Sequence, residues 1–590
     1  MKTRTALVAL ALLVAACGVA GAATDDTSAA ATSSEDVTTV EALSTTAGDE
    51  SSTASTATVT EHADTHSDPA DSEYDQASVI GIVLADGASP TEGNGVTVAG
   101  DTVTITAAGT YRLSGTLSDG SVVVDAADAF VQLVLDGVDI TNSTGAAIAV
   151  NNADEVVMIL ADGSANTLTD AADYVFPAAE TDEPNAALFS AADLTITGAG
   201  SMTVTGNYND GIASKDGLVI ESGTIVVDAI DDGIRGKDYL VVNDGAIDVT
   251  AGGDGLKSDN EDDPTLGFVE INEGTIGIEA SGDGIQAITD VTVTAGTVDV
   301  VAGADTSAES SSKGIQGDVA VTISGGTVSV ASSDDSIHSN GSVTITDGVI
   351  TLATGDDGVH ADGALTVTGG EITVSQSYEG LESALITIEG GVIDIVSSDD
   401  GINVAGGQDG SGQDGGGPGR GGDQFAVHSD YQLIIAGGTI TMDAEGDGLD
   451  SNGIITMSGG TVVVSGPTGN GNGAIDAGSF DISGGLLLAA GSAGMAESPE
   501  ASSSQASVNL MFSSTQNVGT VIQMVDADGK VVFTFEAYKS FQSVVFSSED
   551  VVSGATYDVY VDAVPSGESL GGLYLDGGIG GTAIGSITAG

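Results

Sequence analysis

Two stretches that begin 22 residues apart decide the fold of this chain. They read Asp210-Gly211-Ile212-Ala213-Ser214-Lys215-Asp216 and Asp232-Gly233-Ile234-Arg235-Gly236-Lys237-Asp238. Further copies begin at Asp254, Asp283, Lys313, Asp335, Asp357, Glu379, Asp400 and Asp447, with a degenerate copy at Asn472. Most intervals are 21 or 22 residues, so longer ones indicate insertions, among them the Gly-rich loop predicted at Gly406–Gly422.

A second phrase follows in each repeat, a Gly and then apolar residues spaced by two, as in Gly223-Thr224-Ile225-Val226-Val227. Alternating β-branched residues between glycines predict short strands with one buried face, and the segments are too short for helices. We expect the apolar residue after each Asp-Gly pair to point inward. These residues are Ile212, Ile234, Leu256, Ile285, Ile315, Ile337, Val359, Leu381, Ile402, Leu449 and Ile475.

Three short strands in each repeat of about 22 residues, stacked coil on coil, predict an all-β solenoid, a parallel β-helix. We place it at residues 78–490, with less regular first coils from about 96 to 208. The composition then changes: five of the eleven Phe lie between Phe512 and Phe546, and Val521–Val525 with Lys530–Phe535 predicts a hairpin. Residues 491–590 are therefore predicted to form a small β module that caps the solenoid.

The charge of the chain excludes several classes of protein. It has 590 residues with 11 Lys and Arg against 87 Asp and Glu, a net charge of −76. A nucleic-acid partner needs a basic face, so we expect none. The single Cys excludes a disulfide framework and a Cys-based zinc site. We expect a monomer.

The N-terminus is typical of an exported protein. Met1–Ala16 carries Lys2 and Arg4 before an apolar run that is too short to span a bilayer, and Cys17 follows it directly. We interpret residues 1–16 as a lipoprotein signal peptide and Cys17 as the lipidated residue, with an ordinary signal peptide as the alternative. Residues 17–77, rich in Ser, Thr, Ala, Asp and Glu, are predicted to be a disordered tether. The protein would then sit on the extracellular face of the cell membrane and contact the bilayer through its anchor only.

Stacking turns the first residue of each repeat into a column of carboxylates. Neighbouring carboxylates one coil apart repel by about 0.9 kcal/mol in water, and Ca²⁺ prefers oxygen ligands. The column therefore predicts bound Ca²⁺. The candidate ligands are Asp210, Asp231, Asp232, Asp254, Asp259, Asp283, Asp335, Asp357 and Asp400. A compatible alternative is turn chemistry, because Asp-Gly is a favoured turn pair.

A second column follows the inward residue, and we expect it to face outward. Its members are Ala213, Arg235, Lys257, Gln286, Gln316, His338, His360, Glu382, Asn403, Asp450 and Asp476. His338 and His360 should stack, which we interpret as a polar surface rather than a metal site.

Cations gather in and around this column. Lys215, Arg235, Lys237 and Lys257 are candidates for binding an acidic polysaccharide. Salt bridges to the carboxylate column are an equal alternative. As a lyase, the protein would use Lys257 or Lys313 as the base beside Ca²⁺, although nothing in their spacing requires it.

Several phrases resemble the carbohydrate-binding β-helix family of bacterial surface proteins, over about residues 95–560. They are Glu183–Leu188, Gly206–Ile212, Asp231–Lys237, Gly253–Asn260, Ser377–Glu382 and Phe541–Phe546. The clostridial representative of that family is described as binding cellulose and acidic pectic polymers. The resemblance implies a right-handed parallel β-helix with bound calcium, similar in shape to pectate lyases of the ninth polysaccharide lyase family.

The full calcium-and-lysine set of a lyase does not map onto this chain. We therefore expect calcium-assisted, non-catalytic binding of a uronate-rich pectic polymer or cellulose. The alternatives are a calcium-dependent pectate lyase and a structural adhesin rod.

Overall fold

The computed structural model describes residues 61–91, 93–176, 182–303, 311–405 and 429–590. The described part is built of β-strands apart from one short 3-10 helix, η1 (Pro69–Ser72). None of its helices is long and apolar enough to cross a membrane. The predicted signal peptide, the lipidated Cys17, residues 17–60 of the predicted tether and the loop at Gly406–Gly422 lie outside the described residues.

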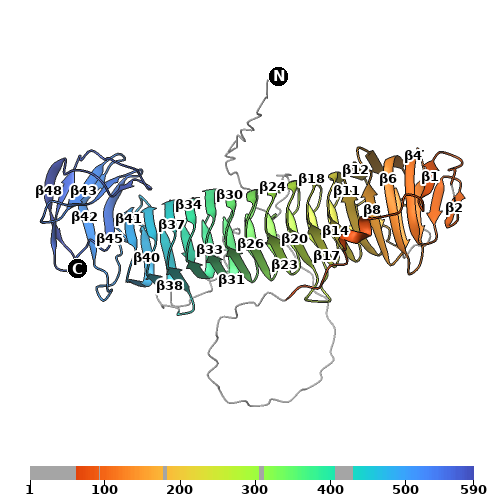
Figure 1. Cartoon of the computed structure of the whole chain (residues 1–590). Coiled ribbons are helices and arrows are strands. Elements are labelled where there is room, and N and C mark those ends of the chain that lie inside the picture. The colour runs from red at the N-terminus through yellow and green to blue at the C-terminus, as the bar shows by residue number, and fades with distance from the viewer. Residues whose placement is uncertain (1–60, 92, 177–181, 304–310, 406–428) are drawn as a thin grey trace, which may run out of the picture. The chain divides into compact units, whose positions relative to one another are not determined.

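The strands form three stacks of parallel strands, as predicted for a β-helix (Figure 1). The first stack carries the Asp-Gly repeats and contains β3 (Thr102–Ile105), β5 (Ser121–Asp125), β7 (Ile148–Asn152), β10 (Ala186–Ser190), β13 (Asp210–Ser214), β16 (Ile234–Gly236), β19 (Leu256–Ser258), β22 (Ile285–Ala287), β25 (Ile315–Gly317), β28 (Ile337–Ser339), β31 (Val359–Val367), β33 (Leu381–Ile388), β35 (Ile402–Val404), β38 (Leu449–Met457) and β40 (Ile475–Ile482). The second contains β1 (Ile80–Leu84), β4 (Gly109–Leu117), β6 (Phe130–Thr141), β8 (Glu155–Leu160), β11 (Asp193–Gly198), β14 (Gly217–Ile220), β17 (Tyr239–Val242), β20 (Phe268–Ile271), β23 (Asp290–Val293), β26 (Ala320–Ile323), β29 (Ser342–Ile345), the second halves of β31, β33, β38 and β40, and β36 (Gln432–Ile435). The third contains β9 (Ala165–Thr169), β12 (Ser201–Gly206), β15 (Thr224–Ala229), β18 (Ala246–Ala251), β21 (Thr275–Ala280), β24 (Thr297–Ala302), β27 (Thr327–Ser332), β30 (Val349–Thr354), β32 (Glu371–Gln376), β34 (Val392–Ser397), β37 (Thr439–Ala444), β39 (Thr461–Ser465) and β41 (Leu486–Gly491).

The register between coils follows the sequence repeat. Ile212 pairs with Ile234, Leu218 with Leu240 and Ile225 with Ile247, so the partners in all three stacks are 22 residues apart. The predicted inward column is confirmed, since each of its residues is at most 1% exposed. These apolar side chains stack along the inside of the solenoid in one continuous core, which stabilises each coil through its neighbours.

The C-terminal residues form the predicted β module. The hairpin is confirmed: β43 (Val521–Val525) pairs antiparallel with β44 (Val531–Glu536) in a sheet with β46 (Thr556–Val561), β47 (Leu573–Tyr574) and β48 (Thr582–Thr588). Two further strands, β42 (Ser507–Gln516) and β45 (Phe541–Ser547), pair with each other, and β45 also pairs antiparallel with β41. The β41 edge of the last coil is therefore paired. At the other end, β2 (Val96–Ala99) pairs antiparallel with β3.

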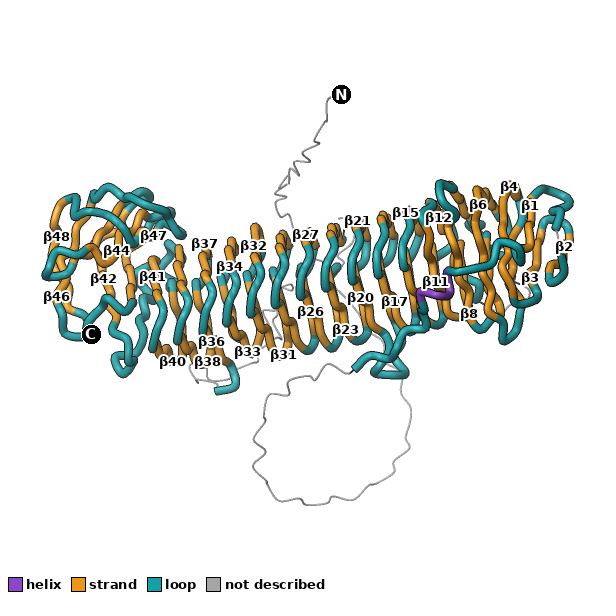
Figure 2. The backbone as a smooth tube through the Cα atoms, viewed as in Figure 1, coloured by secondary structure: helices purple, strands orange, loops and turns teal. Residues whose placement is uncertain are grey.

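Residues 61–77, which we call the strap, were predicted to be part of a disordered tether, and this prediction is wrong for them. The His62 ring stacks on Phe268 with ring centroids 4.0 Å apart. Nδ1 of His66 lies 2.8 Å from the Tyr239 hydroxyl, and its Nε2 lies 2.9 Å from Oγ1 of Thr195. The strap runs over the second stack of strands (Figure 2). Its own composition provides little apolar surface, but the solenoid supplies the aromatic rings on which it packs.

Candidate functional site

The first residues of the repeats form a ladder of carboxylates along the first stack, which we call the acidic ladder. Its members are Asp210, Asp232, Asp254, Asp283, Asp335, Asp357, Glu379, Asp400 and Asp447. In most coils, one oxygen accepts the backbone N–H of the next rung. The N–H of Asp254 donates to Oδ1 of Asp232 (3.0 Å), and the N–H of Asp357 donates to Oδ1 of Asp335 (3.0 Å). These carboxylates therefore join successive coils instead of bonding only within their own turn.

The second column, which we call the polar ladder, does not face outward throughout. Ala213, His360, Glu382 and Asn403 are 1%, 5%, 0% and 6% exposed, so the prediction of an exposed column is wrong for them. Ala213 packs against Ala186 and Phe189, and the three polar side chains turn toward the second oxygen of the acidic ladder. Asn403, for example, donates its Nδ2–H to Oε2 of Glu379 (2.7 Å).

In the N-terminal part of the two ladders, the chain supplies its own cations. Nη2 of Arg235 lies 2.7 Å from Oδ2 of Asp210, and its Nη1 lies 3.3 Å from Oδ2 of Asp259. Nζ of Lys257 lies 2.7 Å from Asp254 and 3.2 Å from Asp232. Arg235 and Lys257 therefore form salt bridges to the carboxylate column, which is the alternative to polysaccharide binding given above. The position beside Asp210, Asp232, Asp254 and Asp259 that was predicted for Ca²⁺ is taken by a guanidinium and an ammonium group.

These ion pairs set the protonation of the groups involved. Burial raises the pKa of Asp210 to about 7, although Arg235 acts in the opposite direction. Burial alone would lower the pKa of Lys257, but the attraction of Asp232 and Asp254 is larger and raises it well above its usual value. The Lys257 amine is therefore a cation at neutral pH.

The other predicted cationic and acidic residues are dispersed. Lys215 forms an exposed ion pair with Glu183 (2.8 Å), and Lys313 pairs with Asp334 (2.9 Å) while its N–H donates to Oδ1 of Asp283. Lys237 is partly exposed, and no ion pair of the described residues includes it. Asp231 is exposed.

Groups that could hold a metal ion occur only farther along the ladders, within the described ranges. The structure brings together Asp400, Asp447 and Asp450, with ligand oxygens within 4.8 Å of one another. Burial and mutual repulsion raise their pKa values to about 8, 6 and 7, and no lysine or arginine pairs with them in the part of the chain described. An all-oxygen set with uncompensated negative charge is suited to Ca²⁺. Asp450 was missed by sequence reasoning, because it belongs to the column assigned to the surface.

An aromatic cluster, Tyr174, Phe176 and Tyr208, lies beside the N-terminal end of the acidic ladder. The rings of Tyr174 and Tyr208 stack with centroids 4.3 Å apart, and Phe176 meets Tyr208 edge-on at 6.1 Å. All three are partly exposed. The Tyr174 hydroxyl lies 2.8 Å from Oδ2 of Asp170, whose Oδ1 accepts the N–H of Asn207, so the cluster is held from both sides. The only signal for it in the sequence was the phrase Gly206–Ile212, which contains Tyr208.

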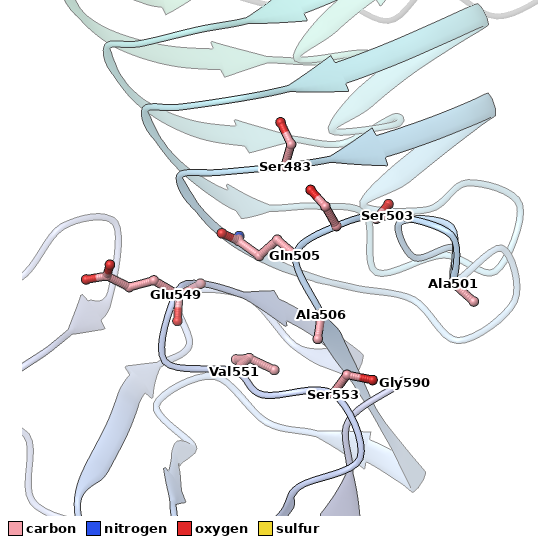
Figure 3. Close-up of a pocket in the computed structure, with 11 residues that line it drawn as sticks. Ser483, Ala501, Ser503, Gln505, Ala506, Glu549, Val551, Ser553 and Gly590 are labelled. Atoms are coloured by element: carbon pink, nitrogen blue, oxygen red, sulfur yellow. The ribbon is translucent and has the colours of Figure 1, made fainter.

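A polar cavity of about 270 Å³ lies where the last coils meet the C-terminal module (Figure 3). It is lined largely by hydroxyl and amide groups, among them Ser483, Ser503, Gln505 and Ser553, together with Glu549. None of the residues predicted for a site lines it.

Part of the chain is similar to proteins described as containing a carbohydrate-binding domain. Residues 99–358 match a family described as "Carbohydrate-binding domain-containing protein", and they include the aromatic cluster and the acidic ladder up to Asp357. A protein of the same description from Acetivibrio thermocellus is 44% identical over 137 residues, 23% of this chain and 48% of the relative. The chain thus spans about half the length of this relative.

A solved structure is also similar in sequence. It is described as the polysaccharide lyase-like protein from C. thermocellum, gadolinium derivative. It is 31% identical, covers 49% of this chain and 96% of its own chain, and superposes with a TM-score of 0.36. The predicted resemblance to a carbohydrate-binding family is supported by the family match and the relative.

Proposed function

We propose that this protein binds polysaccharide on the outer surface of its solenoid, with the aromatic cluster as the site on which sugar rings stack. The observation that carries the proposal is the position of this cluster. Three partly exposed rings lie within the segment that matches a carbohydrate-binding family, next to the charged ladders. Aromatic faces provide large, rigid contact area, and the C–H face of a sugar ring is a suitable partner.

The charges near the cluster favour an acidic polymer. Lys215 reaches Glu183, which follows Tyr174 and Phe176 in the same connection between β9 and β10, and both partners of this pair are more than 40% exposed. Such an exposed pair contributes little to stability, so a uronate carboxylate can replace Glu183 at small cost. Lys237 is the second candidate for contact with a uronate carboxylate. Arg235 and Lys257 are less available to the polymer, because buried ion pairs already hold them.

Calcium is part of the same proposal. Asp400, Asp447 and Asp450 would hold the ion, because their oxygens converge and their negative charges lack a partner cation. When bound, Ca²⁺ would supply positive charge to which the carboxylates of a uronate polymer can bind. The rungs that already pair with Arg235 and Lys257 would not hold Ca²⁺.

The lyase alternative is less favoured. A general base must be able to accept a proton, and the pKa of Lys257 and that of Lys313 are both raised by the neighbouring carboxylates, although burial opposes this. Incubation with polygalacturonate and Ca²⁺ should therefore give no ultraviolet absorbance from an unsaturated product. Appearance of that product, and its loss in Lys257→Ala, would establish the lyase instead.

The proposal also includes the type and location of the solenoid. We assign a right-handed, pectate-lyase-like β-helix of about 22-residue coils, supported by the 22-residue register and by the right-handed rule for parallel crossovers. We place the protein as a monomer on the outer face of the cell membrane, lipid-anchored through Cys17, on the basis of its N-terminal sequence.

The experiment is a comparison of two tyrosine variants in equilibrium binding to polygalacturonate and to cellulose. Tyr208→Ala should weaken binding by about tenfold or more, equivalent to about 1.4 kcal/mol. Tyr538→Ala is the matched control, because Tyr538 is 54% exposed but lies in the C-terminal module. Equal affinity of both variants and the wild type would contradict the proposed site. Absence of binding of the wild type to either polymer would favour the structural adhesin.

A further inference from the structure

The two histidines of the polar ladder lie in adjacent coils and are held in the same way. His338 on β28 and His360 on β31 pair in register, with ring centroids 5.0 Å apart. Nδ1 of His338 lies 2.8 Å from Oδ2 of Asp335. Nδ1 of His360 lies 3.1 Å from Oδ2 of Asp357 and 3.1 Å from Oε2 of Glu382 on the next coil. Each ring therefore turns Nδ1 toward the acidic ladder.

The outer nitrogen of each ring faces an acceptor. Nε2 of His338 lies 3.1 Å from Oδ1 of Asn340, whose amide nitrogen is directed at Asp318, and Nε2 of His360 lies 3.3 Å from Oδ1 of Asp362. Because these oxygens only accept, Nε2 carries a proton in each ring. Loss of the Nδ1 proton on metal binding would then leave Nδ1 as the lone-pair donor on the side of the carboxylates. A second group that fixes the tautomer in this way typically accompanies a histidine that binds metal.

Glu382 is the independent observation that points to a ligand. Its residue is 0% exposed, and neither buried carboxylate oxygen has a well-formed hydrogen bond among the described residues. Nδ1 of His360 lies 3.1 Å from Oε2 but is shared with Asp357, and a buried carboxylate with so few donors is costly. None of the ion pairs of the described residues joins a lysine or arginine to Asp335, Asp357 or Glu382.

The other carboxylates present one free oxygen each to the same space. Oδ1 of Asp335 accepts the N–H of Asp357, and Oδ1 of Asp357 accepts the N–H of Glu379, which leaves Oδ2 of both directed at the histidines. The ligand atoms of Asp357, His360 and Glu382 lie within 4.8 Å of one another, and so do those of Asp335, His338 and His360.

We propose that Asp357, His360 and Glu382 bind a divalent transition-metal ion, of the class of Zn²⁺, Mn²⁺ or Co²⁺, with Asp335 and His338 as adjoining ligands. A mixed set of imidazole nitrogen and carboxylate oxygen suits these ions, whereas Ca²⁺ prefers oxygen alone. The proposal thus assigns Asp357 to a transition metal instead of Ca²⁺, and it makes the histidine pair a metal site instead of a polar surface. The ion would pin β28, β31 and β33 together, independently of any bound polysaccharide.

A proton is the competitor of the metal. With no metal bound, His360 between Asp357 and Glu382 forms an imidazolium that neutralises part of the cluster. A single Nδ1–H can donate well to only one of the two carboxylates, however, and the other remains unsatisfied. A divalent ion contacts both oxygens at once.

The test is metal titration of the full chain after removal of bound ions with a chelator. Co²⁺ is the probe, because its visible absorption reports nitrogen and oxygen ligands, and Zn²⁺ and Ca²⁺ are the competitors. We expect a Co²⁺ spectrum that equimolar Zn²⁺ removes and that excess Ca²⁺ leaves. His360→Ala and Glu382→Gln should each weaken binding by about 100-fold or more, and Asp362→Ala by roughly 10- to 100-fold because Asp362 positions the ring.

Two matched variants provide the controls. Gln286→Ala and Gln316→Ala lie in the same ladder outside the cluster, so both should retain wild-type Co²⁺ affinity. Absence of a Co²⁺ spectrum in the wild type, displacement by Ca²⁺, or unchanged affinity in His360→Ala would overturn the proposal. The wild-type competition decides the matter even if a ligand variant fails to fold, and no polysaccharide is used, so the result is separate from the proposed binding function.

Discussion

Replacement of Arg235 by Ala tests whether the cations of the ladder neutralise buried carboxylates. The Asp210 side chain is 1% exposed, and Arg235 supplies two of its nitrogens to one oxygen of that carboxylate. In Arg235→Ala, the remaining side-chain donor is Nδ2 of Asn209, which lies 2.8 Å from Oδ1. Removal of one member of a buried pair leaves an uncompensated charge and is strongly destabilising.

The pKa of Asp210 gives the size and the pH dependence of the effect. With Arg235 present this carboxyl titrates at about 7, and without Arg235 it titrates higher. A carboxyl whose folded pKa lies above its unfolded value lowers the free energy of unfolding as pH rises from the unfolded to the folded pKa, and the loss levels off above the folded pKa. Below pH 7 Asp210 is protonated in the wild type and in Arg235→Ala, so this carboxyl makes little difference between their free energies of unfolding. Above pH 7 the free energies of unfolding differ by up to about 1.4 kcal/mol per pH unit, or about 3 kcal/mol at pH 9.

Hydrogen exchange of peptides that span residues 206–240 is the suitable assay, because a solenoid opens segment by segment and a single melting temperature does not describe it. Rates are corrected for the intrinsic pH dependence of exchange. We expect Arg235→Ala to lose protection in this segment at pH 9 much more than at pH 6. The double variant Arg235→Ala with Asp210→Asn should lose the pH-dependent part. An equal loss at both pH values, or no rescue by Asp210→Asn, would show that Arg235 does not act by neutralising Asp210.

Three further predictions concern the other parts of the molecule. Asp450→Asn should weaken Ca²⁺ binding by about tenfold or more in calorimetric titration, and unchanged affinity would remove the cluster from the proposal. Ile315→Ala, at a fully buried rung of the core, should destabilise its coils by about 2–5 kcal/mol, whereas Ile315→Val should cost about 0.5–1.5 kcal/mol, both measured by local hydrogen exchange. Burial lowers the pKa of His66 to about 4, so attachment of the strap should weaken by up to about 3 kcal/mol as pH falls from about 6.5 to 4. Limited proteolysis at residues 61–77 should then accelerate at low pH, and faster cleavage at neutral than at acid pH would contradict this.

The solenoid could be predicted from the sequence because its repeat is encoded directly. An apolar residue recurs after each Asp-Gly pair, and residues such as Ile234 and Leu256 become neighbours when the chain closes one coil. The period thus specifies both the inward face and the partner of each strand. The hairpin of Val521–Val525 was also predictable, because its turn and its partner strand follow directly in the sequence.

The remaining features depend on contacts that no local pattern contains. His66 of the strap binds Tyr239, 173 residues away, and the strap is ordered by that surface and not by its own composition. The aromatic cluster joins Tyr174 and Tyr208 through a connection between coils. The position of Glu382 in the polar ladder was predictable from the repeat. Its burial was not, because burial depends on which side chain, a lysine, a histidine or an acid, occupies the neighbouring coil.

The decisive measurement for calcium-assisted polysaccharide binding is the affinity of the purified protein for polygalacturonate with Ca²⁺ and again after addition of a chelator. We expect saturable binding with Ca²⁺ and at least about tenfold weaker binding after chelation, without cleavage of the polymer. Absence of binding under both conditions would show that the protein does not bind this polymer.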